Sequence, residues 1–194
     1  MFIYITRMAR RKTISDRALL DRLLAEIGRV GPQNLTFARA AAAAGLAPAT
    51  LVQRFASREA MVEAILVHAW DRLDLQTAEA DADAPEDACG AVELLMRLTP
   101  EDEIAFAVEN GLLLLREDMR NPALRARGAA WGARLSEALG RRLSQDPEEA
   151  SVLGWQMANV WQGALVWWGF RRHAAPGEAV RAALQAWCCT ALPP

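Results

Sequence analysis

Apolar residues recur every three or four positions along most of this chain, which is the spacing of one face of an α-helix. The first such segment follows Ser15, a good helix N-cap, and ends at Gly31-Pro32. Its apolar residues fall on one face that we expect to be buried: Leu20, Leu24, Ile27 and Val30. No window alternates with a period of two for long enough to predict a strand, so the pattern predicts an all-α protein.

Longer amphipathic segments make up the rest of the chain. Ser57 is the expected N-cap of a long helix. Its apolar stripe consists of Met61, Val62, Ile65, Leu66, Ala69, Trp70 and Leu73. The helix ends in an acidic, proline-containing loop, "DADAPED". Further helices are predicted at about 86–98, 100–116, 121–143, 147–172 and 176–189.

One of these segments is apolar enough to raise the question of a membrane span. Residues 151–170, "SVLGWQMANVWQGALVWWGF", carry no charge over a length that could cross a bilayer. However, Gln156, Asn159 and Gln162 recur every three residues as a polar stripe, which hydrocarbon disfavours and a protein-lined cavity would use. We therefore expect a helix that protein buries nearly all round, and no membrane partner.

The stretch "LTFARAAAAAGLAPATLVQRF", residues 35–55, contains two short helical segments around a glycine. Thr36 is the expected cap of a helix through the alanines, whose small side chains let another helix or a duplex backbone come close. Gly45 supplies the turn, and Pro48 lies near the first position of a second helix at 49–55. This spacing is that of a helix-turn-helix. The alternative is an alanine-rich hairpin without a partner, which would not need the cap, the glycine and the proline together.

The second helix of this motif has an inward and an outward side. At 3.6 residues per turn, Leu51 and Phe55 point inward together, whereas Ala49 and Gln53 point to the opposite side. A helix arranged in this way can lie in the major groove of DNA with its N-terminal half at the base edges.

Charge is divided unevenly along the chain, although the net charge is only −2. Residues 1–66 hold ten lysines and arginines against five aspartates and glutamates, whereas the remainder holds 12 against 19. A basic N-terminal part beside an acidic remainder fits one region that faces nucleic acid and another that does not. An ordinary solvated surface would explain the charges alone equally well, so the asymmetry gains meaning only beside the motif.

The residues give little support to catalytic or metal chemistry. The three cysteines form no CxxC pair, the only histidines are His68 and His173, and the sequence has no GxSxG, GxGxxG, GxxxxGK[ST] or HExxH motif. With 53% hydrophobic and 24% charged residues, the chain can bury a sizeable core. We predict a protein that is not an enzyme, holds no cofactor or metal, and works in a reducing cytoplasm.

The helix-turn-helix and the helices on either side of it resemble the tetracycline-repressor (TetR) family of transcriptional regulators. The resemblance covers residues 17–66: a basic first helix with Gly31 near its end, the helix-turn-helix, and the capped "SREAMVEAIL" of the next helix. It implies an N-terminal three-helix DNA-binding domain, here residues 1–58 with the arm, and a six-helix ligand-binding and dimerisation domain, residues 59–194. It also implies a cytoplasmic homodimer that binds a double-stranded DNA operator and a small-molecule effector.

The resemblance also assigns DNA contacts residue by residue. Thr36 falls at the phosphate-contacting start of the second helix, and Arg58 follows the recognition helix as another backbone contact. The recognition helix itself contributes Pro48, Ala49, Thr50, Val52, Gln53 and Arg54. The amide of Gln53 can pair bidentately with adenine, so we expect it to read sequence. Arg54 lies nearer the flank of the helix and is assigned to phosphate first.

The chain departs from the family pattern at three positions of the helix-turn-helix. A branched apolar residue is usual where Ala40 stands, serine where Ala47 stands, and tyrosine where Val52 stands. The missing serine cap costs on the order of 1 kcal/mol of helix stability, and the missing tyrosine removes a phosphate hydrogen bond. These departures affect the expected affinity for DNA and leave the expected fold unchanged.

The N-terminal arm, "MFIYITRMARRK", places its basic residues after a short apolar stretch, the reverse of a signal peptide. Met8 is therefore a candidate for the true start. Arg10, Arg11 and Lys12 are candidates for further backbone or minor-groove contacts with DNA.

The C-terminal part resembles the family only in its helix count and in fragments such as "REDMRNPALRA". Polar groups amid apolar surface, with two of the seven tryptophans, are the ligand-pocket candidates: Glu109, Asn110, Trp131, Trp155, Gln156, Asn159 and Gln162. Such a pocket would suit a mainly apolar or aromatic effector held by a few hydrogen bonds. For any single tryptophan, the core or the dimer interface is the more ordinary place. His68 is a candidate for coupling the two domains, beside the more ordinary role of a capped or exposed histidine.

The dimer is expected to form through the helices at 147–172 and 176–189. An apolar stripe on the last helix needs a partner beyond the helix already next to it. The residues that we assign to the interface are Trp167, Trp168, Val180, Ala183, Leu184 and Trp187.

Together these features predict a DNA-binding transcriptional regulator. The expected mechanism is that of a ligand-responsive repressor, which binds a palindromic operator as a dimer and is released by a small, mainly apolar effector. The alternative is a lipid or hydrophobic-metabolite binding protein that keeps the fold without operator recognition. DNA binding that weakens with salt would favour the first function over the second.

Overall fold

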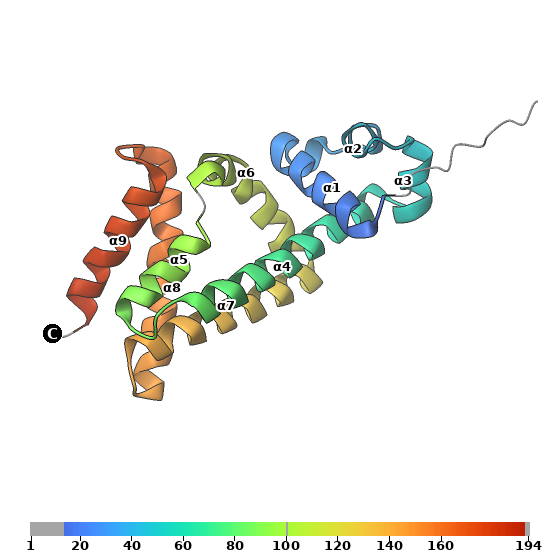
Figure 1. The fold of residues 1–194 in the computed structure, drawn as a ribbon. Coiled ribbons are helices and arrows are strands. Elements are labelled where there is room, and N and C mark those ends of the chain that lie inside the picture. The colour runs from blue at the N-terminus through green and yellow to red at the C-terminus, as the bar shows by residue number, and fades with distance from the viewer. Residues whose placement is uncertain (1–13, 100, 193–194) are drawn as a thin grey trace, which may run out of the picture.

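The computed structural model describes residues 14–99 and 101–192, the latter range without the side chains of residues 101–110. This part of the chain is helical throughout, with no strand among its residues (Figure 1). In chain order the elements are α1 (Asp16–Val30), η1 (Pro32–Asn34), α2 (Phe37–Ala44), α3 (Pro48–Phe55), α4 (Arg58–Asp83), α5 (Ala88–Arg97), α6 (Glu101–Arg120), α7 (Pro122–Leu143), α8 (Pro147–Arg171) and α9 (Pro176–Ala191). The all-α prediction is confirmed, and the predicted ranges differ from these bounds by only a few residues.

The helices form two units that share the long helix α4. Figure 1 shows α1, α2 and α3 together at one end of the molecule, and α4 running from them towards α5, α8 and α9 with α7 beside it. We call α1 to α3 and the first two turns of α4 the N-terminal unit, and the remainder the C-terminal unit. The predicted division at residue 58 would cut at the start of α4, although the residues after it still pack in the first core.

Each unit has its own hydrophobic core. The core of the N-terminal unit is aliphatic, with Leu19, Leu23, Ile27, Leu35, Leu51, Met61, Ile65 and Leu124 among its buried residues. The core of the C-terminal unit contains Trp131 and Trp161 beside aliphatic residues from α5, α7, α8 and α9. Trp70, near the middle of α4, packs against both cores and so joins them.

The buried face of α1 lies about one residue away from the predicted one. Leu19, Leu23 and Ile27 are fully buried, whereas Leu20 and Leu24 are only partly buried against the same core. The predicted face was therefore right only at Ile27. The error arose because α1 carries adjacent leucine pairs, and periodicity alone does not say which member of each pair faces the core.

A ladder of ion pairs joins α4 to α7. Arg127 lies 2.8 Å from Asp74, Arg134 also pairs with Asp74, and Arg141 pairs with Asp81. Partners advance together along both helices, so α4 and α7 run in the same direction. The acidic residues of α4 are thus largely neutralised inside the protomer.

The buried side chain of Arg142 binds the C-terminal end of α4. Its side chain is fully buried and donates hydrogen bonds to the Asp81 carboxylate (2.6 Å) and to the backbone carbonyls of Asp81 (2.7 Å), Ala84 (3.2 Å) and Pro85 (2.8 Å). Burial disfavours the charged form of Asp81, but the hydrogen bonds from Arg141 and Arg142 outweigh it and hold the pKa of this carboxyl below its ordinary value. A buried guanidinium with all these partners fixes the loop that follows α4.

Within the protomer, α8 is buried on one face and not all round. Leu153, Met157 and Trp161 are buried, and Gly154 lets the helix approach α7 so closely that a Cβ there would lie 2.0 Å from the Ser136 carbonyl oxygen. The opposite face is uncovered, with Trp167 63% and Phe170 77% exposed. Among the described helices, α8 included, none has the length and hydropathy of a membrane span.

Candidate nucleic-acid interface

The turn of the predicted helix-turn-helix has the expected geometry. The Thr36 hydroxyl accepts a hydrogen bond from the Arg39 amide at 3.2 Å and so caps α2. Gly45 ends α2 in the left-handed conformation (φ 69°, ψ 34°), and the next amide, that of Leu46, donates to the Ala41 carbonyl at 2.9 Å. A side chain at position 45 would be strained, so glycine is required here.

Small residues let the two helices of the motif pack closely. Ala40, Ala41 and Ala44 are buried on the inner side of α2, and Leu51 is the buried residue of α3. Ala40 is fully buried at this inner position. The alanine run is therefore a core surface on one side of α2.

The outer side of α3 is open to solvent. Pro48, Ala49, Gln53 and Arg54 are exposed, and Val52 is 45% exposed. Leu51 is fully buried and Phe55 partly buried against the core, which is the rotation predicted from the sequence. No side chain caps α3 at Ala47, as expected from the missing serine.

A tight turn connects α3 to α4. Ala56 has φ 61° and ψ −47°, and the Ser57 amide donates to the Phe55 carbonyl at 2.7 Å. This is close to a γ-turn with positive φ, which is strained for a residue with a Cβ. The turn sets the direction of α3 relative to α4, and strained backbone of this kind is found mainly near functional surfaces.

The guanidinium of Arg58, which was predicted to contact phosphate, is held by backbone carbonyls of its own unit. Its Nε donates to the Leu35 carbonyl at 3.0 Å and its Nη2 to the Pro32 carbonyl, while Nη1 lies 3.7 Å from Glu59. The guanidinium therefore ties the start of α4 to the loop before α2, and its donors point into the unit. Sequence position placed Arg58 beside the recognition helix, but these carbonyls more than 20 residues away along the chain hold it inward.

Arg54 lies on the flank of α3 and faces α1. Its guanidinium forms an ion pair with Asp16, in the first turn of α1, and its side chain is 32% exposed. The flank position agrees with the rotation predicted for this helix, and its role towards DNA stays a prediction.

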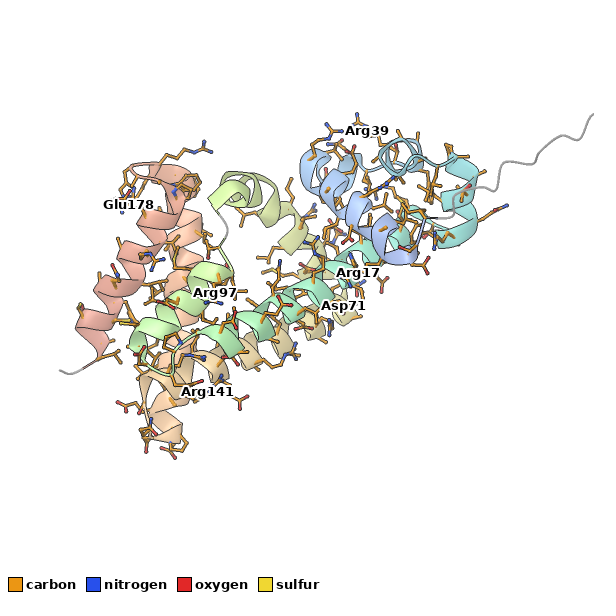
Figure 2. The ribbon with its side chains drawn as sticks, viewed as in Figure 1. Arg17, Arg39, Asp71, Arg97, Arg141 and Glu178 are labelled. Atoms are coloured by element: carbon orange, nitrogen blue, oxygen red, sulfur yellow. The ribbon has the colours of Figure 1, made fainter. Side chains whose placement is uncertain are left out.

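Arg39 is a candidate that the sequence interpretation missed. It lies in the first turn of α2, is exposed, and projects from the outer edge of the N-terminal unit (Figure 2). Arg22 of α1, by contrast, donates to the Ala44 carbonyl at 2.9 Å and so satisfies a carbonyl at the C-terminal end of α2. The signal that could have found Arg39 is its position three residues after the cap Thr36, where the amides of the helix also attract an anion.

Three predicted DNA contacts and two predicted pocket residues lie outside the described side chains. The first group is Arg10, Arg11 and Lys12. The second group is Glu109 and Asn110 in α6. Their assignments stay predictions.

The other pocket candidates are not brought together. Trp131 is buried between Trp70 and Trp161, with ring centroids 5.8 and 6.4 Å away, and donates to the Thr77 hydroxyl at 2.9 Å. In contrast, Trp155, Gln156, Asn159 and Gln162 are all at least partly exposed on α8. The polar stripe does not line a cavity within the described part of the protomer, which corrects the expectation, because no described helix covers this face of α8.

A carboxyl group of α6 is held against the junction of the two units. Asp118 accepts a hydrogen bond from Trp70 Nε1 at 3.1 Å. Burial raises the pKa of Asp118, and the bond from Trp70 only partly opposes this shift. The contact links α6 to the helix that both units share.

An open groove of about 760 Å³ lies at the same junction. It is bounded by the loop after α1, the start of α4 and the turn from α6 to α7, with Glu59, Glu63, Arg116 and Arg120 among its lining residues. Among the described side chains, none of the predicted pocket residues lines this groove.

His68 joins α4 to α1. Its Nε2 lies 2.8 Å from Asp21, which also lies 3.5 Å from Arg72. The hydrogen bond with His68 holds the pKa of the Asp21 carboxyl below its ordinary value. The histidine thus links α4 to the first helix of the N-terminal unit, and coupling between the two domains stays a prediction.

The predicted dimer residues fall into two groups. Val180 and Leu184 are fully buried and Trp168 nearly so, all within the protomer. Trp168 also donates to the Ala174 carbonyl at 3.0 Å. Ala183 and Trp187 are partly buried, and Trp167 is largely exposed. The assignment of Val180 and Leu184 to a partner surface is therefore wrong, because α5 and α8 already pack against the stripe on α9, and Trp168 of α8 is likewise buried within the protomer.

Comparisons with known proteins match this geometry. Residues 19–65 match the model of the bacterial regulatory proteins of the tetR family. No curated protein matches the chain.

Several solved structures share the fold over nearly the whole chain. A proposed transcriptional regulator from Pseudomonas aeruginosa PAO1 has a TM-score of 0.68 at 17% identity, over 90% of this chain and 89% of that one. The TetR family regulator PfmR from Thermus thermophilus has a TM-score of 0.60 at 17% identity, over 86% of this chain and 94% of that one. A proposed regulator from Saccharomonospora viridis, solved in complex with choline, has a TM-score of 0.63 at 18% identity, over 88% of this chain and 93% of that one. The N-terminal helices therefore match the bacterial regulatory proteins of the tetR family, and the chain as a whole shares the fold of these solved regulators.

Proposed function

We propose that this DNA-binding regulator is a ligand-responsive repressor, which binds a palindromic operator as a dimer and is released by a small, mainly apolar effector. The observation that carries the proposal is the exposed outer side of α3, held by a capped α2, the Gly45 turn and the strained joint at Ala56. A short helix held in this way can enter a major groove without rearrangement of its unit.

The side chains of the motif divide into base and backbone contacts. Gln53 points most directly outward and is assigned to adenine, and Ala49 and Pro48 to apolar contact such as a thymine methyl. Thr50 and Val52 lie at the sides of the same surface. Thr36 contacts phosphate, and Arg39 replaces Arg58 as its basic partner. Arg10, Arg11 and Lys12 add contacts from the arm.

The dimer surface is the uncovered face of α8. Val152, Trp155, Trp167 and Phe170 are exposed along it, and the rings of Trp167 and Phe170 are 5.8 Å apart. A Cβ at Gly163 would meet nothing within 4 Å, so a second helix can approach closely there. A second copy of the chain would bury this apolar area and would pair Gln156 and Asn159 across the two-fold axis.

The effector is assigned to the predicted ligand-binding domain, residues 59–194, and DNA binding to residues 1–58. The aromatic core around Trp131 and the predicted polar groups on α6 suit an apolar or aromatic ligand. The Saccharomonospora viridis structure contains choline, and a quaternary ammonium on tryptophan faces is a second chemistry to test.

Selection from a pool of randomised duplexes tests the proposal as a whole. The enriched sites should contain an inverted repeat, because a two-fold dimer presents α3 twice. Affinity for the enriched site should fall by orders of magnitude between 50 and 200 mM salt. A flat salt response, or bound lipid without any DNA affinity, would instead favour the carrier function.

A further inference from the structure

We propose that Asp16 is a specificity residue: its carboxylate occupies Arg54 and thereby lowers the affinity of the recognition surface for DNA of arbitrary sequence. Asp16 is the first residue of α1, Arg54 lies in the last turn of α3, and the two side chains form an ion pair. The inference rests on the proposed DNA-binding function.

The pair stands at the rim of the recognition surface. Ala49 and Gln53 point outward from α3, whereas Arg54 is turned towards the flank next to α1. The Arg54 side chain is 32% exposed and that of Asp16 is 78% exposed. The carboxylate is therefore the more accessible member, and a duplex seated on α3 would meet it.

The surroundings of Asp16 would otherwise attract an anion. The N-terminus of α1 carries a partial positive charge, Arg54 is a full cation, and Arg17 is exposed one residue further along. Asp16 supplies the anion from within the protein. A DNA phosphate that approaches Arg54 must separate this pair and come close to a like charge.

This arrangement acts differently on the two kinds of DNA. On arbitrary sequence, the phosphate contact has to be made against the repulsion of Asp16, so affinity is lowered. On the preferred operator, contacts of Gln53 and Ala49 hold the duplex in register, and Arg54 can exchange its carboxylate partner for a DNA group. A repulsive element that penalises the wrong partner more than the right one raises specificity.

Asp16→Asn tests the proposal because it keeps the shape of the side chain and removes its charge. Affinity is measured as a function of salt for a duplex of random sequence and for the duplex enriched by selection. We expect about tenfold tighter binding of the random duplex. The slope of log affinity against log salt concentration should be steeper by about 0.9 per protomer, as for one added phosphate contact. The enriched duplex should gain less, so the ratio between the two affinities falls.

Two further variants separate this effect from a change of net charge. Asp83→Asn removes the same charge from an exposed pair with Arg97, in the C-terminal unit, and should change neither affinity. Arg54→Ala should cancel the effect of Asp16→Asn in the double variant.

Each other outcome has a definite meaning. Equal effects of Asp16→Asn and Asp83→Asn, or an effect that persists without Arg54, would overturn the role of Asp16. Weaker binding of both duplexes would also overturn it, since Asp16 would then orient Arg54 for contact. If the unmodified chain bound no duplex, the proposed function itself would fail, and this role with it.

Discussion

Arginine has different partners in the two units of the molecule. In the C-terminal unit, Arg127, Arg134 and Arg141 pair with the aspartates of α4, and Arg142 is buried on the end of that helix. In the N-terminal unit, Arg54 pairs with Asp16, but two other arginines hold backbone carbonyls: Arg22 that of Ala44, and Arg58 those of Leu35 and Pro32. The ion pairs of the C-terminal unit neutralise the acidic helix α4, whereas the bonds of Arg22 and Arg58 to carbonyls connect separate segments of the N-terminal unit.

The two units also differ in how much of their exposed positive charge is paired with carboxylates. Positive charge in the C-terminal unit is matched locally by the α4–α7 ladder. In the N-terminal unit, Arg39 is left exposed on α2 and forms no salt bridge with a carboxylate of the described residues. Excess positive charge on one unit attracts polyanions even when the whole chain is slightly acidic.

Removal of Arg142 should have the largest effect on stability. Arg142→Ala leaves Asp81 without its buried partner and removes the hydrogen bonds to three carbonyls at the end of α4 and in the following loop, which should cost about 3–5 kcal/mol of unfolding free energy. Urea unfolding measures the loss. Arg134→Ala removes an exposed member of the same ladder and should cost about 0–1 kcal/mol. Similar losses in the two variants would contradict the closing role of Arg142.

The two arginine roles in the N-terminal unit can be separated by Arg58→Ala and Arg39→Ala. Arg58→Ala should lower the unfolding free energy by about 1–3 kcal/mol, since it removes hydrogen bonds from a charged donor to two loop carbonyls. The salt slope of DNA binding by the folded variant should stay unchanged. Arg39→Ala should leave stability nearly unchanged and flatten that slope by about 1 per protomer. The reverse result would restore Arg58 as the phosphate contact.

Much of the N-terminal unit was predictable because its signals are local. Ser15, Thr36 and Ser57 each cap a helix by accepting from an amide three residues later, and Gly45 has the conformation that its place in the sequence predicts. The role of Arg58 was not predictable, since its partners are 23 and 26 residues away. A local pattern does not encode such contacts.

In the C-terminal unit, helix positions were predictable but the partners of their faces were not. The stripe of α9 at Val180 and Leu184 is covered within the protomer, whereas the polar and aromatic face of α8 is not. An apolar stripe shows that a helix is covered and does not say by which helix. The hydrogen bonds of Trp131 and Trp161 with Thr77 and Thr99 span 54 and 62 residues and are equally invisible to periodicity.

A pair of glycines in α7 tests how rigid the junction of the two cores is. A Cβ at Gly128 would lie 3.1 Å from the ring of Trp70, which Asp118 and Trp131 hold in place. Gly128→Ala should therefore cost about 1–2 kcal/mol of unfolding free energy, even after the helical preference for alanine. At Gly132 the near neighbour is the far edge of the exposed Trp155 ring, which can move aside. Gly132→Ala should be neutral or slightly stabilising, and an equal loss in both variants would contradict a rigid Trp70.

The smallest expected effect concerns pH. Because burial raises the pKa of Asp118, the folded state holds its proton more tightly than the unfolded state, whose value is near 3.8. The stability contributed by the protonated group is lost as pH rises from this value through the folded pKa. Asp118→Asn keeps an oxygen for Trp70 and removes the charge, so thermal unfolding near neutral pH should occur at a slightly higher temperature than in the unmodified protein. The difference should disappear in acid, and a difference that persists there would have another cause.

The claim that the outer side of α3 reads DNA sequence is tested most directly by repeating the duplex selection with Gln53→Ala. We predict that the inverted repeat survives, that preference relaxes at one position in each half-site, and that affinity for the original site falls by about 1–3 kcal/mol. The salt slope should stay the same, because Gln53 makes no phosphate contact. An unchanged base preference in Gln53→Ala, with the preference abolished by Arg54→Ala, would contradict this claim. The face of α3 that contacts the bases would then be rotated by about 100° from the one proposed.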